Sequence, residues 1–107
     1  MTSGRGAAQA GATRQIISVV AAHYGVSVEQ IMSQSRKRVF ARPRQVAMYL
    51  VRDLTGRSYP WIGGAFGRDH STVVQNVALV DRLRQTDSAI AADVAALTCA
   101  LARRDAA

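Results

Sequence analysis

The feature that most constrains the fold is a pair of predicted helices separated by a very short turn. Gly67 is expected to end the first helix, because glycine readily adopts the left-handed conformation that terminates helices. Asp69 is a typical N-cap residue for the second helix, which carries Val73, Val77 and Val80 on one face. Two helices joined so tightly indicate a helix-turn-helix motif.

The remainder of the sequence also has helical periodicity, with no strand pattern and no internal repeat. Residues 1–12 are small and glycine-rich, which predicts a disordered tail before a domain that spans residues 13–104. Capping residues and apolar stripes predict helices that begin near positions 13, 27, 43, 58, 69 and 87. The sequence therefore predicts an all-α fold of about six helices around one core.

The balance of charge indicates a polyanionic partner. The chain of 107 residues contains 14 Lys and Arg against 7 Asp and Glu, which gives a net charge of +7. Lys37 is the only lysine, so almost all of the positive charge is carried by arginine. Since a planar guanidinium can make two hydrogen bonds to a phosphate or to a guanine edge, nucleic acid is the favoured partner.

Enzymatic and metal-dependent functions find no support in the residues. Lys37 does not belong to a phosphate-binding loop, so ATP hydrolysis is not expected. His23, His70 and Cys99 lack the spacing of zinc ligands, and His70 has no partners that would complete a catalytic site. The sequence thus predicts no enzyme, no cofactor and no metal. Cys99 lies in an Ala/Leu-rich stretch, where we expect a buried free thiol.

No segment resembles a membrane anchor. The longest apolar run covers residues 46–51, far fewer than the roughly 20 that a bilayer-spanning helix needs. Residues 2–12 lack the apolar core of a signal peptide. We therefore expect a soluble, cytoplasmic protein.

A segment without acidic residues, between Glu29 and Asp53, concentrates the positive charge. Its basic residues are Arg36, Lys37, Arg38, Arg42, Arg44 and Arg52. Part of the segment lies in a predicted loop over residues 33–41, and part at the start of a helix with Pro43 in its first turn. A basic loop can enter a minor groove while a helix lies in the adjacent major groove. The alternative is a solvated charged face without a ligand.

The N-terminus of the predicted recognition helix carries the polar run Arg68-Asp69-His70-Ser71-Thr72. This end of a recognition helix faces the base edges. Asp69 can accept a hydrogen bond from a cytosine amino group, and His70 can meet a base edge or a thymine methyl. Ser71 and Thr72 can reach bases or phosphates. The alternative is structural, with Asp69 as an N-cap and the others as ordinary first-turn residues.

These segments together resemble the C-terminal DNA-binding domain of the bacterial chromosomal replication initiator family, DnaA. The resemblance rests on Ala41-Arg42-Pro43-Arg44-Gln45, then Ala47-Met48, then Ile62-Gly63 and Phe66-Gly67-Arg68-Asp69-His70-Ser71-Thr72-Val73. It extends in register from about residue 16 to residue 83 and includes nothing of the family's ATPase domain. It implies an all-helical domain that recognises a short duplex box, with a basic loop in the minor groove and the helix-turn-helix in the major groove.

The resemblance also implies roles for individual residues. Base contacts are implied for Arg36 in the minor groove, for Pro60 on a thymine methyl, and in the major groove for Asp69, His70 and Ser71. Arg44, Gln45, Arg52 and Thr72 fall on phosphate-contacting positions of the family, and the expected DNA backbone contacts are completed by Lys37, Arg38, Arg68 and Gln75.

Three positions depart from the family pattern. Gly67 stands alone between Phe66 and Arg68, where the family usually has two glycines, so the turn before the recognition helix is one residue shorter. Ser71 stands where threonine is usual, which removes a methyl group able to pack on thymine, and Gln75 replaces a common histidine. We therefore expect DNA binding, but the base sequence recognised in the major-groove half of the box can differ from that of the family.

We interpret the chain as a sequence-specific protein that binds double-stranded DNA at initiator-box-like sites on the nucleoid. It would regulate replication initiation or transcription without its own ATPase, as a monomer or weak dimer. One alternative is the DNA-binding domain of a full replication initiator, and another is a non-specific basic nucleoid protein. A third is a module that binds the initiator or another regulator through the apolar stripe formed by Ile90, Val94, Leu97 and Leu101.

Overall fold

The computed structural model describes residues 2–106 of the chain, and the side chains of residues 11–104. This part of the chain forms α1 (Thr2–Tyr24), α2 (Val28–Met32), α3 (Arg38–Thr55), α4 (Tyr59–Phe66), α5 (His70–Thr86) and α6 (Ser88–Ala106). Within the described residues there are six helices and no strand, so the predicted all-α fold is confirmed.

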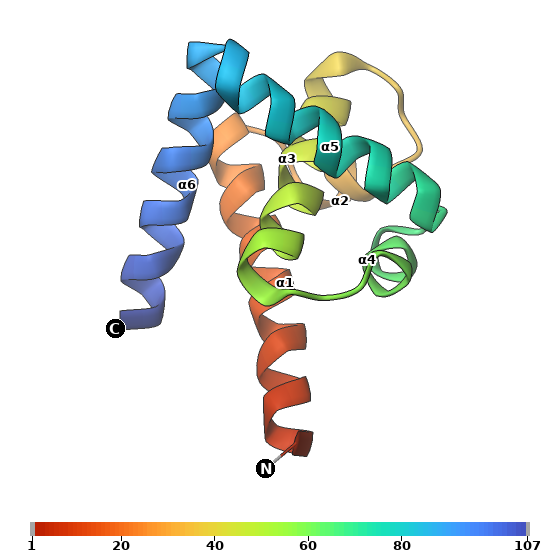
Figure 1. The fold of residues 1–107 in the computed structure, drawn as a ribbon, viewed down its shortest axis with the longest axis vertical. Helices are drawn as coiled ribbons and strands as arrows, with labels where there is room; N and C mark the ends of the chain where they lie inside the picture. Colours follow the sequence, from red (N-terminus) through yellow and green to blue (C-terminus); the bar gives the residue numbers. More distant parts are fainter. Residues whose placement is uncertain (1, 107) are drawn as a thin grey trace.

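Helix α3 is the centre of the domain and packs against each of the other five helices. Figure 1 shows α5 crossing the molecule between α4 and the beginning of α6, while α6 lies beside α1. The helix-turn-helix is formed by α4 and α5, and both of these helices pack on α3. The position of α5 is therefore set by its packing against α3, α4 and α6.

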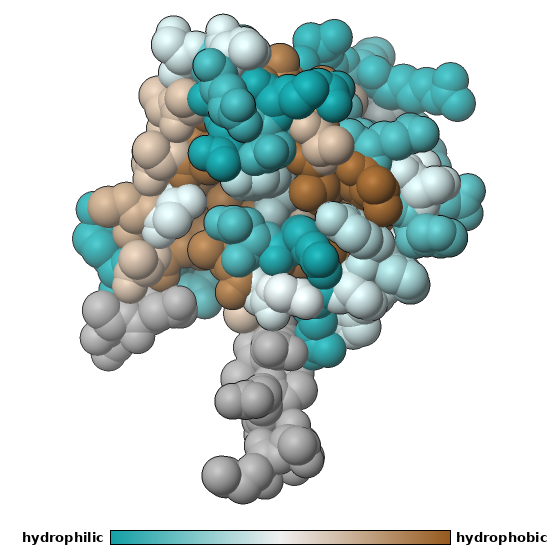
Figure 2. All heavy atoms as spheres, in the orientation of Figure 1, coloured by the Kyte–Doolittle hydropathy of each residue, from teal (hydrophilic) through white to brown (hydrophobic). Residues whose placement is uncertain are grey.

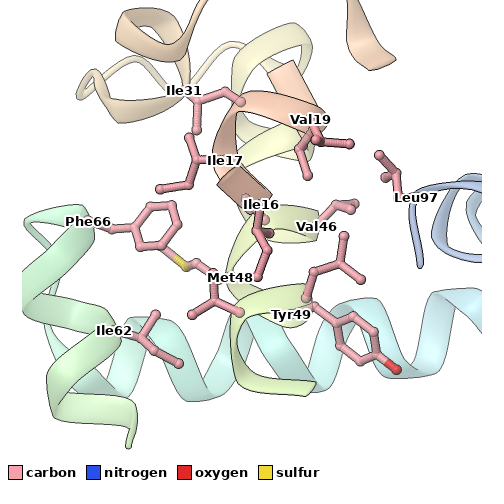
Figure 3. Close-up of a cluster of buried hydrophobic side chains, with 14 of the residues drawn as sticks. Ile16, Ile17, Val19, Ile31, Val46, Met48, Tyr49, Ile62, Phe66 and Leu97 are labelled. Atoms are coloured by element: carbon pink, nitrogen blue, oxygen red, sulfur yellow. The ribbon is translucent and has the colours of Figure 1, made fainter. Parts of the chain in front are cut away.

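The core is built around the middle of α3. Residues 46–51 of this helix are all buried, which explains why the longest apolar run of the sequence is continuous rather than periodic. Met48 points toward Phe66 and lies close to Ile62, so α4 is anchored in the core (Figure 3). Ile16 and Ile17 approach from α1 and complete the same cluster.

The predicted helix boundaries are confirmed where capping side chains define them. Ser27 and Gln30 form the expected capping box, because the Gln30 N–H donates to Ser27 Oγ at 3.0 Å and the Ser27 N–H donates to Gln30 Oε1 at 2.9 Å. Ser58 accepts a hydrogen bond from the Trp61 N–H at 3.2 Å and caps α4. Asp87 caps α6 by accepting from the backbone N–H of Ala89 at 2.9 Å.

Two helix starts differ from the prediction. Helix α3 begins at Arg38, so Pro43 lies inside the helix and not in its first turn. The carbonyl that loses its helical donor to Pro43 is that of Val39, which is 58% exposed, so water can take the place of the missing N–H. Helix α1 begins at Thr2 and thus includes residues 2–12, where the sequence predicted a disordered tail. Of the described side chains, Thr13 is the first that is buried.

Helix α6 differs from the prediction in what it exposes. Cys99 was expected to be buried, but it is exposed. The core-facing stripe of α6 contains Leu97 and Leu101, and each lies two residues, or about 200° around the helix, from Cys99. The expectation for Cys99 rested on its apolar neighbours in the sequence, whereas its position on the helix lies away from the stripe that contains Leu97 and Leu101. Because Leu97 and Leu101 pack into the chain's own core, this stripe is not a free surface for a partner.

A polar clasp that the sequence did not indicate holds α6 against α1. Asp93 accepts a hydrogen bond from the Tyr24 hydroxyl at 2.9 Å, and His23 Nε2 lies 2.9 Å from its other carboxylate oxygen. Burial is the main cause that raises the pKa of the Tyr24 hydroxyl, and the neighbouring Asp93 carboxylate raises it further.

Among the described residues, none of the helices has both the length and the apolarity of a bilayer-spanning segment.

Candidate nucleic-acid interface

The turn between α4 and α5 consists of residues 67–69 only. Gly67 has a φ of 66°, in the left-handed region, and reverses the chain direction after α4. The backbone N–H of Gly67 and that of Arg68 both donate to the carbonyl of Gly63, the latter at 2.8 Å. The single glycine thus suffices for a hydrogen-bonded turn, and α5 can begin directly at His70.

Gly63 allows this turn to lie directly on α4. A methyl group at this position would lie 2.5 Å from the carbonyl oxygen of Arg68 and 3.3 Å from the backbone nitrogen of His70. The neighbouring Gly64 has no such contact, since a methyl group there meets nothing within 4 Å. Sequence reasoning assigned no role to Gly63, and its only signal was its place in the segment Ile62-Gly63 that resembles the initiator family.

The first residues of α5 present polar side chains to solvent. Asp69, His70 and Ser71 are exposed, and Thr72 is half-buried. Asp69 occupies the N-cap position, as predicted, but its side chain makes no capping hydrogen bond. The carboxylate therefore does not have the structural role that was the alternative to base contact. Gln75 is exposed one helical turn further along α5.

The basic loop between α2 and α3 is shorter than predicted and has a defined internal shape. The Ser35 N–H donates to Ser33 Oγ at 3.3 Å, and the Lys37 N–H donates to Ser35 Oγ at 3.2 Å. Arg36 and Lys37 are exposed in this loop, and Arg38, now the first residue of α3, is also exposed. In Figure 2, hydrophilic residues gather along the upper edge of the molecule, where Figure 1 places α5 and this loop.

Arg44 is buried, although a DNA backbone contact was expected of it. It is 6% exposed; its Nε donates to the carbonyl of Ile31 at 2.6 Å and an Nη donates to that of Gln30 at 3.4 Å. Burial lowers the pKa of the Arg44 guanidinium, and the positive charge of Arg68 lowers it further. Arg44 therefore ties the C-terminal end of α2 to α3.

Arg68 likewise bonds to backbone carbonyls. One Nη donates to the carbonyl of Phe66 at 3.1 Å, and the other donates to the carbonyl of Ser33 at 2.7 Å. Ser33 is the C-cap of α2, and Phe66 is the last residue of α4. A single side chain thus joins the helix-turn-helix to the start of the basic loop.

Several predicted residues from the loop, α3 and α5 surround one polar hollow. It is lined by Gln34, Ser35, Arg36, Ala41, Arg44, Gln45, Arg68, Thr72 and Asn76. Three of these residues are arginines and none is acidic, so the lining of the hollow carries a net positive charge. Gln45 also accepts a hydrogen bond from Arg42 at 3.0 Å, which holds its side chain at the rim.

Arg52 and Pro60 lie outside this hollow, near the start of α4. Pro60 is exposed at the second position of that helix. Arg52 donates to the carbonyl of Arg57 at 2.8 Å, and its guanidinium lies 4.3 Å from the centre of the Tyr59 ring. Arg52 thus fixes the chain between α3 and α4. Its expected phosphate contact would have to use the N–H groups of the guanidinium that do not donate to the Arg57 carbonyl.

The short turn, the exposed polar residues that begin α5 and the acid-free hollow beside them define a helix-turn-helix protein of the DNA-binding class. The comparisons with known proteins agree. Residues 13–80 match the model of a family described as "Bacterial dnaA protein helix-turn-helix". Because this match covers more than half of the chain, the chain belongs to that family, whose role is DNA binding and not catalysis.

Individual relatives support the same assignment. The chain is 51% identical over 84 residues to the chromosomal replication initiator protein DnaA of Sphingopyxis alaskensis, a match that covers 78% of this chain and 18% of the relative. It is 45% identical over 94 residues to the DnaA protein of Magnetococcus marinus, with 87% and 21% covered. The chain thus spans about a fifth of the length of these relatives.

Proposed function

We propose that this chain binds duplex DNA sequence-specifically at initiator-box-like sites and acts in replication initiation or in the control of transcription. The observation that carries the proposal is the acid-free hollow, which joins the Arg36 loop to the first turn of α5. Exposed polar side chains stand beside a positively charged surface there, as they do where a protein contacts both bases and phosphates. The relatives named as chromosomal replication initiator proteins support a role at replication origins on the bacterial nucleoid.

The base contacts would come from two elements. Asp69, His70 and Ser71 are exposed at the end of α5 that faces base edges in a helix-turn-helix. Arg36 is exposed in the loop, and an arginine in this position can enter a narrow, A·T-rich minor groove. Pro60 would add an apolar contact to a thymine methyl from the start of α4.

The backbone contacts would come from a second group of residues around the first. Lys37 and Arg38 are exposed at the end of the loop, so their charges are available to phosphates. Gln45, Thr72 and Gln75 would add neutral hydrogen bonds. Contributions of Arg44, Arg52 and Arg68 to phosphate binding are limited by the carbonyl groups to which these side chains already donate.

Non-specific binding is the competing function, because the net charge of +7 alone attracts any nucleic acid. Fluorescence anisotropy at physiological salt separates the two, with a duplex that carries an initiator-type box and a scrambled duplex of equal composition. A preference of roughly a thousandfold or more for the box would support specific recognition. If the two duplexes bind equally, selection from random duplexes decides whether the shorter turn recognises another site, and failure to enrich any sequence would refute specific binding.

A further inference from the structure

The two segments that the proposed function assigns to the two DNA grooves are joined by one side chain. Arg68 donates to the carbonyl of Ser33, 35 residues earlier in the chain, at 2.7 Å. Its other Nη donates to the carbonyl of Phe66 at 3.1 Å. Ser33 begins the loop that carries Arg36, and Phe66 immediately precedes the turn to α5.

We propose that Arg68 is a positioning residue, which couples the placement of the Arg36 loop to the helix-turn-helix. The proposal rests on the proposed function for its effect on DNA, but the contact itself belongs to the free protein. Its consequence is that the preference for an A·T-rich end of the site depends on Arg68, although Arg68 contacts no base there.

The loop depends on such a tie because the helix before it is short. Helix α2 has five residues, too few to be stable without tertiary contacts. Hydrogen bonds from Ser35 and Lys37 fix the internal shape of the loop but not its place relative to α5. Arg44 holds the last turn of α2 to α3 through the carbonyl of Ile31, and Arg68 holds the carbonyl of Ser33, two residues further along, to the end of α4. The orientation of Arg36 toward DNA therefore follows from these two ties.

Only a guanidinium can make this bridge in the geometry observed. Its two Nη groups point in fixed directions, and each meets a different carbonyl, one on each of the two segments. A lysine would keep the positive charge but would present it as a compact ammonium group without this fork. Arg68→Lys therefore removes the bridge while preserving the charge that attracts phosphates.

The first test measures the loop in the free protein, without DNA. Amide hydrogen exchange at Ser35 and Lys37 reports how firmly the loop is held. We expect Arg68→Lys to speed this exchange by about tenfold, as loss of a charge-assisted hydrogen bond would. Arg82→Lys is the matched control, because Arg82 is exposed on α5, the helix that follows the turn, and is distant in sequence from Arg68. Unchanged exchange in a folded Arg68→Lys protein would overturn the proposal.

The second test is a double-mutant cycle on DNA, with a box duplex and the same duplex carrying G·C pairs at its A·T end. The wild type should prefer the A·T form by roughly 5- to 150-fold for each exchanged pair. Arg36→Ala and Arg68→Lys should each reduce this preference, and the double variant should lose little more than either single variant. Arg68→Lys should leave the salt dependence unchanged. Independent, multiplicative losses would overturn the coupling.

The two tests fail in distinguishable ways. If the wild type binds box and scrambled duplexes equally and no sequence is enriched from random duplexes, the proposed function fails, while the exchange experiment still decides the coupling. If the wild type is specific but Arg68→Ala lowers the salt dependence by about one unit and keeps the A·T preference, Arg68 is a phosphate contact and the coupling is refuted.

Discussion

Gly63→Ala should leave the domain less stable than Gly64→Ala, the adjacent substitution in the same helix, does. The added methyl group at position 63 would lie 2.5 Å from the Arg68 carbonyl oxygen, whereas carbon and oxygen atoms in contact are normally about 3.3 Å apart or more. The turn would have to move by roughly 0.8 Å, on the difference between these two distances. Because the obstructing atom is backbone, it cannot turn aside as a flexible side chain would.

The pair of variants isolates the steric effect. Both residues lie in α4, so replacing either glycine by alanine gains about the same helix propensity, close to 1 kcal/mol. Overpacking at position 63 opposes this gain with about 1–3 kcal/mol, and position 64 has open space. The free energies of unfolding of the two variants should thus differ by about 1–3 kcal/mol, which corresponds to roughly 5–20 °C in Tm for a domain of this size.

Thermal unfolding followed by circular dichroism measures this difference directly. The Gly64→Ala protein should melt above the temperature of the wild type, and the Gly63→Ala protein should melt at or below that of the wild type and clearly below that of Gly64→Ala. Below its melting temperature, Gly63→Ala should also lose box preference, because the displaced turn carries Asp69 and His70. Equal melting temperatures for the two variants would show that the turn does not lie on α4 as described.

Three further outcomes follow from the contacts of individual side chains. His70→Ala should weaken binding to the preferred duplex by about 1–3 kcal/mol and change binding to random DNA little, and equal losses on both would exclude a base contact. Arg44→Ala should lower the free energy of unfolding in urea by about 1.5–3 kcal/mol, because it removes a charged hydrogen bond to the buried carbonyl of Ile31; a purely electrostatic loss of DNA affinity without loss of stability would contradict this. The raised pKa of Tyr24 means that the folded state favours its protonated hydroxyl, so stability should fall as pH rises above the ordinary tyrosine value of about 10. Tyr24→Phe should reduce that alkaline dependence in urea titrations, while Tyr49, whose pKa is also raised by burial, retains its own part; an unchanged pH profile would assign the dependence to groups other than Tyr24.

The parts of the fold that the sequence predicted are those decided by neighbouring residues. Ser27 caps α2 because Gln30 is three positions away, and Gly67 ends α4 because its own backbone adopts the left-handed conformation. The start of α3 was missed, because residues 38–42 are charged or lack apolar periodicity and Pro43 is typical of a first turn. The helix tolerates Pro43 in its interior because the carbonyl that loses its donor belongs to Val39, an exposed residue.

The parts of the site that the sequence could not predict depend on partners distant in the chain. Exposure of Asp69 and His70 follows from the local motif, and the structure has both side chains exposed, as predicted. Arg44 and Arg68 carry the same charge as Arg36 but bond to carbonyls of α2, Ser33 and Phe66, which no spacing in the sequence relates to them. Arginine in a basic segment therefore indicates a positive surface, but not which guanidinium groups remain available to a ligand.

This division of the arginines bears on how salt should affect DNA binding. Each phosphate neutralised contributes about −0.9 to the slope of the logarithm of the binding constant against that of salt concentration. The predicted interface has six cationic side chains: Arg36, Lys37, Arg38, Arg44, Arg52 and Arg68. If each of them neutralised a phosphate or entered the groove as a full charge, the slope would be about −5. Arg44, Arg52 and Arg68 donate to carbonyls, which leaves Arg36, Lys37 and Arg38 exposed. A slope of about −3 is therefore expected. A slope of about −5 would mean that the three bonded arginines leave their carbonyls when DNA binds.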